Sequence, residues 1–281
     1  MFWEVLQKYS AASFKRATGV HRIIFEELVV IIADYKRLHR KDSTKGRKSS
    51  LSIENQLLMV LMYLREYRTQ YHIGITYGLS ESRVCETIKE IENIIIQDSR
   101  YHLPGKKALT RSENEIEVVL IDVSESPIER PKKKQRNYYS GKKKRHTQKT
   151  QIVADRESKK IICTAFDKGK KHDFRLYKES KTGIHLTKKI QVDTGYQGLQ
   201  KLHSNTDIPK KKAKKQPLSE EDKKGNRNIS SQRVLIENVI RELKIFRIVA
   251  EKYRNRRKRF GIRVNMIAAI YNRSLDLNLK K

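Results

Sequence analysis

The sequence predicts an all-α part followed by an α/β part in which helices flank a mixed sheet. Apolar residues recur at helical spacing through residues 10–98, whereas short runs rich in Val, Ile and Thr begin at residue 117. These two patterns are typical of helices and of strands, respectively. The 281 residues are also enough for a main domain and a smaller one. We therefore expect a helical domain over residues 1–108 and an α/β domain over residues 109–281.

Two apolar stripes indicate helices in the first part. One runs through residues 23–32 and the other through residues 57–64, with apolar residues three or four positions apart. The polar segment DSTKGRKSS separates the two stripes, and Ser52 follows it. Because serine is a preferred N-cap residue, we expect the second helix to begin just after Ser52.

Residues 69–97 have the pattern of a helix-turn-helix. A short helix is expected near residues 70–75, Gly78 supplies the turn, and Ser80 is a good N-cap for the helix that follows. The side chains expected to face DNA lie at the start of that second helix; they are Glu81, Ser82, Arg83, Glu86 and Thr87. Two core helices of an ordinary bundle would give the same pattern, but the positive charge of Arg83 favours DNA.

Four strand-like runs and one short helix are expected in the second part. The runs are VVLIDVS, HTQKTQIVADRE, KKIICTAF and KIQVDTG, and the helix covers residues 172–180. Strands first, and a strand alternating with a helix later, indicate a mixed sheet. Asp173 is expected to cap the helix, with a supporting role beside other acids as the alternative.

Two aspartates follow apolar runs of this second part. Asp122 comes directly after four apolar residues, and a carboxylate in a central strand is costly unless a cation or hydrogen-bond donors compensate it. Asp193 follows a similar run, and the glycines of TGYQG allow the chain to turn sharply there. These positions favour a catalytic or metal-binding role. The alternatives are that Asp122 caps the end of a strand and that Asp193 belongs to an ordinary turn.

A third acid lies on an amphipathic helix near the end of the chain. Arg233, Glu237 and Lys244 are separated by four and seven residues, so on a helix they fall within an arc of about 40°. Exposed helix ion pairs would explain this stripe equally simply. Together with Asp122 and Asp193, however, Glu237 would supply three carboxylates of the kind that hold divalent metal ions.

The chain is strongly basic, with 63 Lys and Arg against 32 Asp and Glu and a net charge of +31. Such a balance indicates a polyanionic partner, and nucleic acid is the first candidate. A basic segment with tyrosines between residues 131 and 149 is expected to form a DNA-facing hairpin. Its central cations are Lys142, Lys143, Lys144 and Arg145. Ribosomal proteins and histones share this charge balance, so charge alone does not indicate catalysis.

The remaining sequence features indicate a cytoplasmic protein. Cys85 and Cys163 form no CxxC motif, so neither a zinc finger nor a disulfide is expected. The apolar stretches are interrupted by charges and are too short to cross a membrane, and the charged N-terminus lacks the apolar core of a signal peptide. We expect no membrane association, and access to DNA in the cytoplasm.

Several motifs resemble those of DDE transposases of bacterial insertion sequences, specifically insertion-sequence family five. They are IDVSESPIERPKKKQRNYYSGKKKRHTQKTQ, KKHDFRLYKES, VDTGYQG, IPKKKAKK and RVLIENVIRELKIFRI. The resemblance implies an RNase H-like catalytic domain with Asp122, Asp193 and Glu237 as the catalytic, metal-binding triad. It also implies that Arg233 and Lys244 contact DNA near the scissile end. Ser230 stands where the wider superfamily has a tyrosine, so a tyrosine role does not transfer.

The resemblance also implies a reaction. The protein would bind the terminal inverted repeats of an insertion sequence and use two Mg²⁺ ions, with Mn²⁺ as a substitute, for cleavage and strand transfer into target DNA. A homo-oligomer on DNA and association with the bacterial nucleoid are expected. Two alternatives remain: a metal-dependent nuclease that does not join strands, and a transposase-derived regulator that only binds DNA.

Overall fold

The computed structural model describes residues 2–39, 50–112, 115–212 and 217–279. It contains two compact units. The first comprises Met1–His102, Lys244–Ala250 and Arg256–Lys281, and the second comprises Leu103–Leu243 and Glu251–Asn255. The expected division into residues 1–108 and 109–281 differs from this one, because residues 103–108 group with the second unit and the last helix of the chain groups with the first. Most of the polar DSTKGRKSS segment, and the end of the basic run that starts at Lys210, lie outside the described residues.

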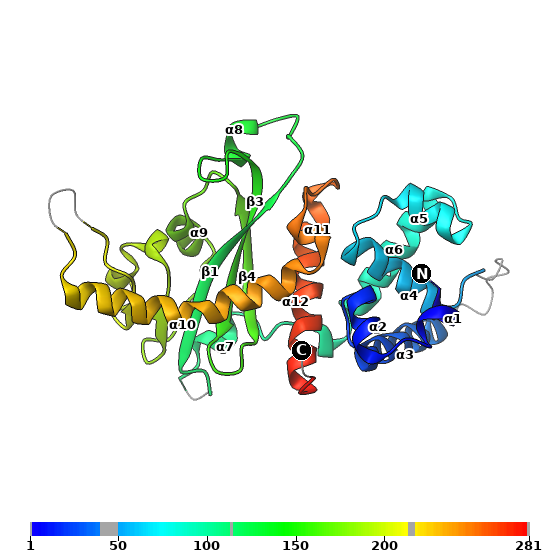
Figure 1. Cartoon of the computed structure of the whole chain (residues 1–281), viewed down its shortest axis with the longest axis horizontal. Coiled ribbons are helices and arrows are strands. Elements are labelled where there is room, and N and C mark those ends of the chain that lie inside the picture. Colours follow the sequence, from blue (N-terminus) through cyan, green and yellow to red (C-terminus); the bar gives the residue numbers. More distant parts are fainter. Residues whose placement is uncertain (1, 40–49, 113–114, 213–216, 280–281) are drawn as a thin grey trace. The chain divides into compact units, whose positions relative to one another are not determined.

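In the described residues of the first unit all regular elements are helices, as expected (Figure 1). Its helices are α1 (Trp3–Leu6), α2 (Ala11–Thr18), α3 (Arg22–Leu38), α4 (Ile53–Arg65), α5 (Gln70–Tyr77), α6 (Glu81–Ile95), α11 (Arg247–Ala250) and α12 (Phe260–Asp276), with the 3-10 helices η1 (Ser99–Tyr101) and η4 (Arg257–Arg259). Both predicted N-caps are confirmed. The hydroxyl of Ser52 accepts a hydrogen bond from the Asn55 amide, and that of Ser80 accepts one from the Arg83 amide. Gly78 ends α5 in the left-handed conformation, at φ 66°, which glycine adopts without strain.

A buried ion-pair cluster joins α6 to α12 within the first unit. The Glu92 side chain is 0% exposed, and its carboxylate accepts hydrogen bonds from Arg263 Nε at 2.6 Å and Arg259 Nε at 2.8 Å. A buried carboxylate is tolerated only when such partners compensate its charge. The arginine side chains therefore explain why the end of the chain belongs to this unit.

The second unit contains the expected mixed sheet. Its strands are β1 (Val118–Pro127), β2 (Tyr139–Ser140), β3 (Arg145–Asp155), β4 (Ile161–Lys168), β5 (Lys189–Gln191) and β6 (Thr206–Asp207). β1 pairs antiparallel with β3 on one side and parallel with β5 on the other. β4 continues the antiparallel side and β6 continues the parallel side. β1 is therefore a central strand, as its apolar sequence predicts.

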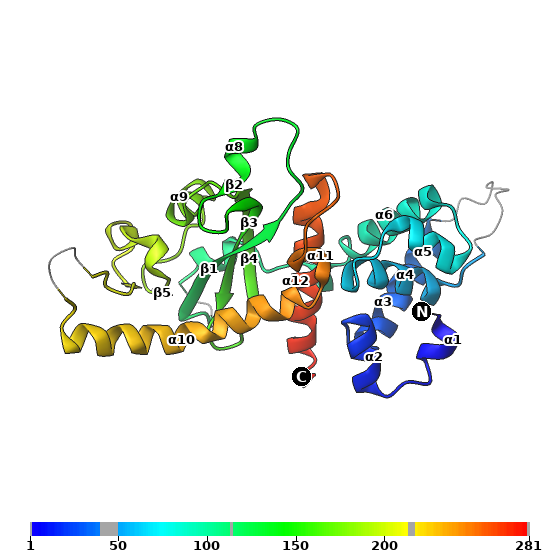
Figure 2. The ribbon, with the colours of Figure 1, turned by 45° about the horizontal axis from the view of Figure 1, so that its top comes forward.

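Helices lie on both faces of this sheet. They are α7 (Lys107–Thr110), α8 (Gln135–Tyr138), α9 (Asp173–Glu179) and α10 (Glu220–Lys244), with the 3-10 helices η2 (Thr194–Tyr196) and η3 (Leu199–Lys201). The apolar core on one face includes Val119, Ile121, Val153, Ile190 and Val192, together with Tyr177 of α9. α10 crosses the sheet in both views (Figures 1 and 2), and its Gln232 accepts a hydrogen bond from Gln191 of β5. Among the described residues, no helix has the length and apolar character needed to cross a membrane.

Candidate active site

Asp122 lies in the middle of β1 rather than at its end. It pairs with Ile152 of β3, and the strand continues to Pro127, so the alternative of a strand-end cap is wrong. Burial raises the pKa of Asp122 to about 6, although the Val123 amide, which donates to its Oδ1 at 2.8 Å, and the charge of Arg233 oppose this rise. The site thus contains a carboxylate whose negative charge is poorly stabilised by the protein alone.

Asp193 lies beside Asp122 because β5 runs parallel to β1. The register pairs Leu120 with Gln191, the last residue of β5, so Asp193 follows two residues beyond that strand and at about the level of Asp122. Successive side chains of a strand alternate between faces, so Asp122 lies on the face opposite to Val119 and Ile121, where Arg233 of α10 reaches it. Asp193 also caps η2, accepting a hydrogen bond from the Gly195 amide at 2.8 Å. The negative charge of Asp193 contributes to the raised pKa of Asp122.

Gly195 gives two carboxylates room to lie close together. A Cβ atom at this position would be 2.8 Å from Asp193 Oδ1 and 3.1 Å from Asp173 Oδ2. Asp173 is therefore a neighbour of Asp193. The expectation that Asp173 caps α9 is wrong, because His172 occupies the N-cap position and Asp173 is the first helical residue. The position of Asp173 near Asp193 fits the alternative, a supporting role beside the other acids.

A buried lysine compensates Asp173. Lys149 of β3 is 7% exposed, and its Nζ donates to Asp173 Oδ1 at 2.6 Å while lying 3.8 Å from Glu125 Oε1. Glu125 also accepts a hydrogen bond from the Thr147 hydroxyl at 2.7 Å. These acids therefore have close partners, whereas the cation nearest to Asp122 is more distant. Sequence reasoning missed Lys149, which lies 24 residues from its partner.

Arg233 of α10 reaches Asp122. Its Nη2 lies 3.9 Å from Asp122 Oδ1, and its Nε is buried without a hydrogen-bond partner in the described part of the chain. Glu237, one helical turn further, is exposed. Among the described residues, no three Asp, Glu, His or Cys side chains are close enough together to hold a metal ion. The structure thus unites Asp122 and Asp193 but does not close the expected triad, and the role of Glu237 stays a prediction.

Lys244 is the last residue of α10. It is exposed, and it groups with the first unit rather than with the sheet. Its expected contact with DNA remains a prediction.

The aspartate pair fits a divalent cation. The two carboxylates are adjacent, both oxygens of each are hard ligands of the type that Mg²⁺ prefers, and the charges of Asp193 and Asp173 add to the pKa rise that burial causes at Asp122. A bound cation would reverse this effect, since a nearby positive charge favours the ionised carboxylate.

The start of α6 presents the predicted helix-turn-helix surface. Ser82 and Arg83 are exposed, and Arg83 Nη1 lies 3.3 Å from Glu86 Oε2 in a surface ion pair. Thr87 was expected on this surface, but it is 7% exposed and its hydroxyl donates to the Arg83 carbonyl at 2.9 Å. That expectation is wrong, because Thr87 lies on the inner side of the helix.

The predicted basic hairpin is confirmed as a structure. β2 and the start of β3 pair antiparallel, with Ser140 opposite Arg145. The Lys143 amide donates to the Ser140 hydroxyl at 3.2 Å, which fixes the turn. Its four central cations are all exposed, namely Lys142, Lys143, Lys144 and Arg145. Four adjacent exposed cations form a surface suited to phosphates, and their contact with DNA remains a prediction.

Comparisons with known proteins match both the region of the aspartates and the helix-turn-helix. Residues 121–272 match the family described as DDE superfamily endonuclease, and residues 49–100 match the helix-turn-helix of DDE superfamily endonuclease. A protein of Microchaete diplosiphon, described as "Probable transposase for insertion sequence element IS702", is 46% identical over 274 residues, which is 98% of each chain. No solved structure matches the chain. The chain therefore belongs to the DDE superfamily of endonucleases, as a DNA-cleaving transposase of an insertion sequence with a helix-turn-helix domain.

Proposed function

We propose that this transposase binds the terminal inverted repeats of its insertion sequence and both cuts and joins DNA at a site built on Asp122, Asp193 and Glu237. The observation that carries the proposal is the adjacent pair Asp122 and Asp193, in which the register of parallel strands brings together two acids 71 residues apart in the sequence. Burial and like charge make this pair unfavourable without a cation. Structural positions rarely require such an arrangement, whereas sites for phosphodiester chemistry do.

The fold proposed for the catalytic unit is RNase H-like. The sheet order supports it, since β1 has antiparallel neighbours on one side and parallel neighbours on the other. α10 supports it further, because this helix brings Arg233 to the aspartate on the central strand.

Members of the superfamily depend on divalent metal ions, and we propose two Mg²⁺ ions here, with Mn²⁺ as a substitute. Asp122 and Asp193 would hold them, and Glu237 would complete the ligand set. When bound, the metal supplies activation of water and stabilisation of the leaving oxygen. Because the water and later the freed 3′-hydroxyl act as nucleophiles, no covalent bond between protein and DNA is required.

The chain's own residues bind and orient the DNA. Arg233 would contact a phosphate beside Asp122, and the lack of a partner for its Nε in the described part of the chain supports this role. Lys244 would contact the backbone near the scissile end. The exposed hairpin, Lys142 to Arg145, would hold a flanking stretch of backbone, and Ser82 and Arg83 of α6 would contact the terminal repeat. We propose that the protein acts as a homo-oligomer on DNA in the bacterial cytoplasm, at the nucleoid.

The test is a strand-transfer assay. The protein is incubated with a duplex that carries the element's terminal repeat and with a target plasmid, in the presence of Mg²⁺ or of EDTA. The proposal expects joined products with Mg²⁺ and none with EDTA. Nicks without joined products would show a nuclease, and binding without cleavage would show a regulator, so either result would overturn the proposal.

A further inference from the structure

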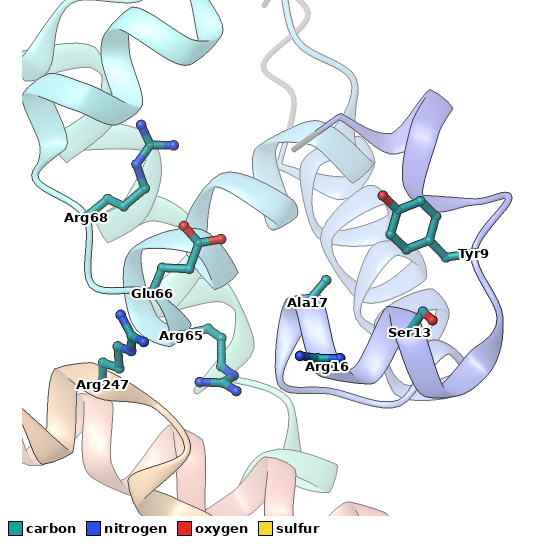
Figure 3. Close-up of a pocket in the computed structure, with 8 residues that line it drawn as sticks. All are labelled: Tyr9, Ser13, Arg16, Ala17, Arg65, Glu66, Arg68 and Arg247. Atoms are coloured by element: carbon teal, nitrogen blue, oxygen red, sulfur yellow. The ribbon is translucent and has the colours of Figure 1, made fainter.

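Four arginines line one pocket of the first unit (Figure 3). Arg16 comes from α2, Arg65 from the end of α4, Arg68 from the loop that follows α4, and Arg247 from α11. The cavity measures about 650 Å³, and its remaining lining residues are Tyr9, Ser13, Ala17 and Glu66. Four arginines against one glutamate give the lining a formal excess of three positive charges.

The wall of this pocket is built by close packing around Arg65. Gly19 has a φ of 84°, and a Cβ atom there would be 2.9 Å from Arg65 Cδ and 3.0 Å from the Phe246 ring. The guanidinium of Arg65 donates from Nη1 to the Ile245 carbonyl, while its Nε is buried with no partner among the described residues. Arg65 is therefore held in place by packing and by a backbone hydrogen bond, rather than by a neighbouring acid.

The positive charges of Arg65 and Arg247 in the pocket repel each other. Burial, followed by the positive charge of Arg247, lowers the pKa of Arg65, and Glu66 offsets only part of this effect. An arginine in a protein nevertheless stays protonated. The protonated Arg65 is therefore destabilised by burial and by repulsion from Arg247, and an anion in the pocket would reduce this destabilisation.

We propose that this pocket binds a phosphodiester of the DNA backbone, as a phosphate contact separate from the base-reading surface of α6. The proposal rests on the DNA binding proposed above. Arg68 directly precedes Thr69, the N-cap of α5, and the first helix of a helix-turn-helix crosses the DNA backbone. A cavity of this size admits a phosphate with its neighbouring sugar, and guanidinium groups bind phosphate oxygens in pairs. The hydroxyls of Tyr9 and Ser13 add neutral hydrogen-bonding groups.

Binding measurements on the full-length protein test the proposal. Arg16 and Arg247 are exposed, so Arg16→Gln and Arg247→Gln should fold normally. Each variant is expected to bind duplex DNA about tenfold more weakly and to lower the slope of log K against log salt by about 1. The loss should be equal for a terminal-repeat duplex and a scrambled duplex, because phosphate contacts carry no base information. Arg16→Lys keeps the charge and should recover part of the affinity.

The matched control is Arg37→Gln. Arg37 is an exposed arginine of the same unit that pairs with Asp34 on α3, and its removal should leave affinity and salt slope unchanged. An equal loss in the control and in the pocket variants would overturn the proposal, because general positive charge would then explain the binding.

A duplex with single methylphosphonate substitutions identifies the phosphate. A substitution at one phosphate, or at two adjacent phosphates, should weaken DNA binding by the wild type. The same substitution should have no further effect on binding by Arg16→Gln.

If wild type binds DNA but both glutamine variants bind it equally well, the pocket assignment fails while the proposed function stands. If inorganic phosphate raises the melting temperature of wild type but not of the variants, and DNA affinity is unchanged, the pocket takes a small anion and the backbone assignment is overturned. Wild type that binds no DNA would contradict the proposed function itself.

Discussion

Arg233 Nη2 lies 3.9 Å from Asp122 Oδ1, across the contact between α10 and the central strand β1. This separation is too long for a strong charge-assisted hydrogen bond. Both side chains are mostly buried, with 17% and 19% of their surfaces exposed. Asp122 is therefore a carboxylate that folding removes from water without a close cation, and its ionised form destabilises the folded protein.

Asp122→Asn should stabilise the metal-free protein near neutral pH. Burial raises the pKa of Asp122 from 3.8 to about 6, so the folded state holds its proton more tightly than the unfolded state does. Wild type and variant should be equally stable below about pH 3, where the carboxyl is protonated in both states. Above about pH 6 the variant should gain about 2 to 3 kcal/mol in unfolding free energy. Urea denaturation in EDTA at several pH values measures this difference, and a variant no more stable at neutral pH would contradict it.

The three acids should be required for chemistry but not for DNA binding. Asp122→Asn, Asp193→Asn and Glu237→Gln each remove a negative oxygen ligand while keeping the side-chain size. Each variant should lose DNA cleavage and still shift a terminal-repeat duplex in an electrophoretic assay. Glu221→Gln is the matched control on α10, because Glu221 is an exposed acid near the start of the same helix. Normal cleavage by any of the three variants would remove that residue from the triad.

Gly195→Ala should impair catalysis more than stability. The new Cβ would meet Asp193 Oδ1 at 2.8 Å, closer than Cβ atoms normally approach another atom, so the carboxylate must move. A displacement of about 1 Å in a catalytic site can reduce the rate by about a hundredfold. The comparison is Gly225→Ala on α10, where an added Cβ meets nothing within 4 Å. Cleavage rates and melting temperatures of both variants test this, and a normal rate for Gly195→Ala would show that Asp193 tolerates the shift.

Local sequence signals predicted most of the secondary structure and the proximity of the two aspartates in the candidate active site. The N-caps Ser52 and Ser80 depend on residues three positions away, so pattern alone identifies them. The convergence of Asp122 and Asp193 also follows from local features. Each acid comes directly after a short apolar run, and the parallel pairing of β1 with β5 brings these two runs to one level of the sheet.

Contacts between distant residues could not be predicted from the sequence. Lys149 and Asp173 form their pair only after β3 and α9 have packed together. The assignment of α12 to the first unit depends on Arg263, which is 171 residues from Glu92. Neither arginine nor lysine in a strongly basic chain signals a buried partner, because such residues are mostly exposed.

Asp173→Asn should slow cleavage without abolishing it. Asp173 lies beside Asp193, but the ammonium group of Lys149, at 2.6 Å, already compensates its charge. A role in positioning the neighbouring carboxylate therefore predicts a partial loss, of about tenfold to a hundredfold. The measurement compares single-turnover cleavage by Asp173→Asn and Asp193→Asn at several Mg²⁺ concentrations. Complete loss at saturating Mg²⁺ would indicate that Asp173 itself is a ligand.

Arg263→Met should destabilise the first unit strongly. The variant removes the 2.6 Å hydrogen bond to Glu92, whose side chain is 0% exposed, and leaves Arg259 as the carboxylate's remaining cation at 2.8 Å. Removing one partner of a buried pair costs about 3 kcal/mol or more. The control is Arg100→Gln, which breaks the pairs that this 45% exposed arginine forms with Asp98 and Glu27 and should cost less than about 1 kcal/mol. Urea denaturation followed by helical circular dichroism measures both effects. Equal losses in the two variants would show that burial of Glu92 adds no penalty, whereas the expected difference would show that the end of the chain stabilises the helical unit through this carboxylate.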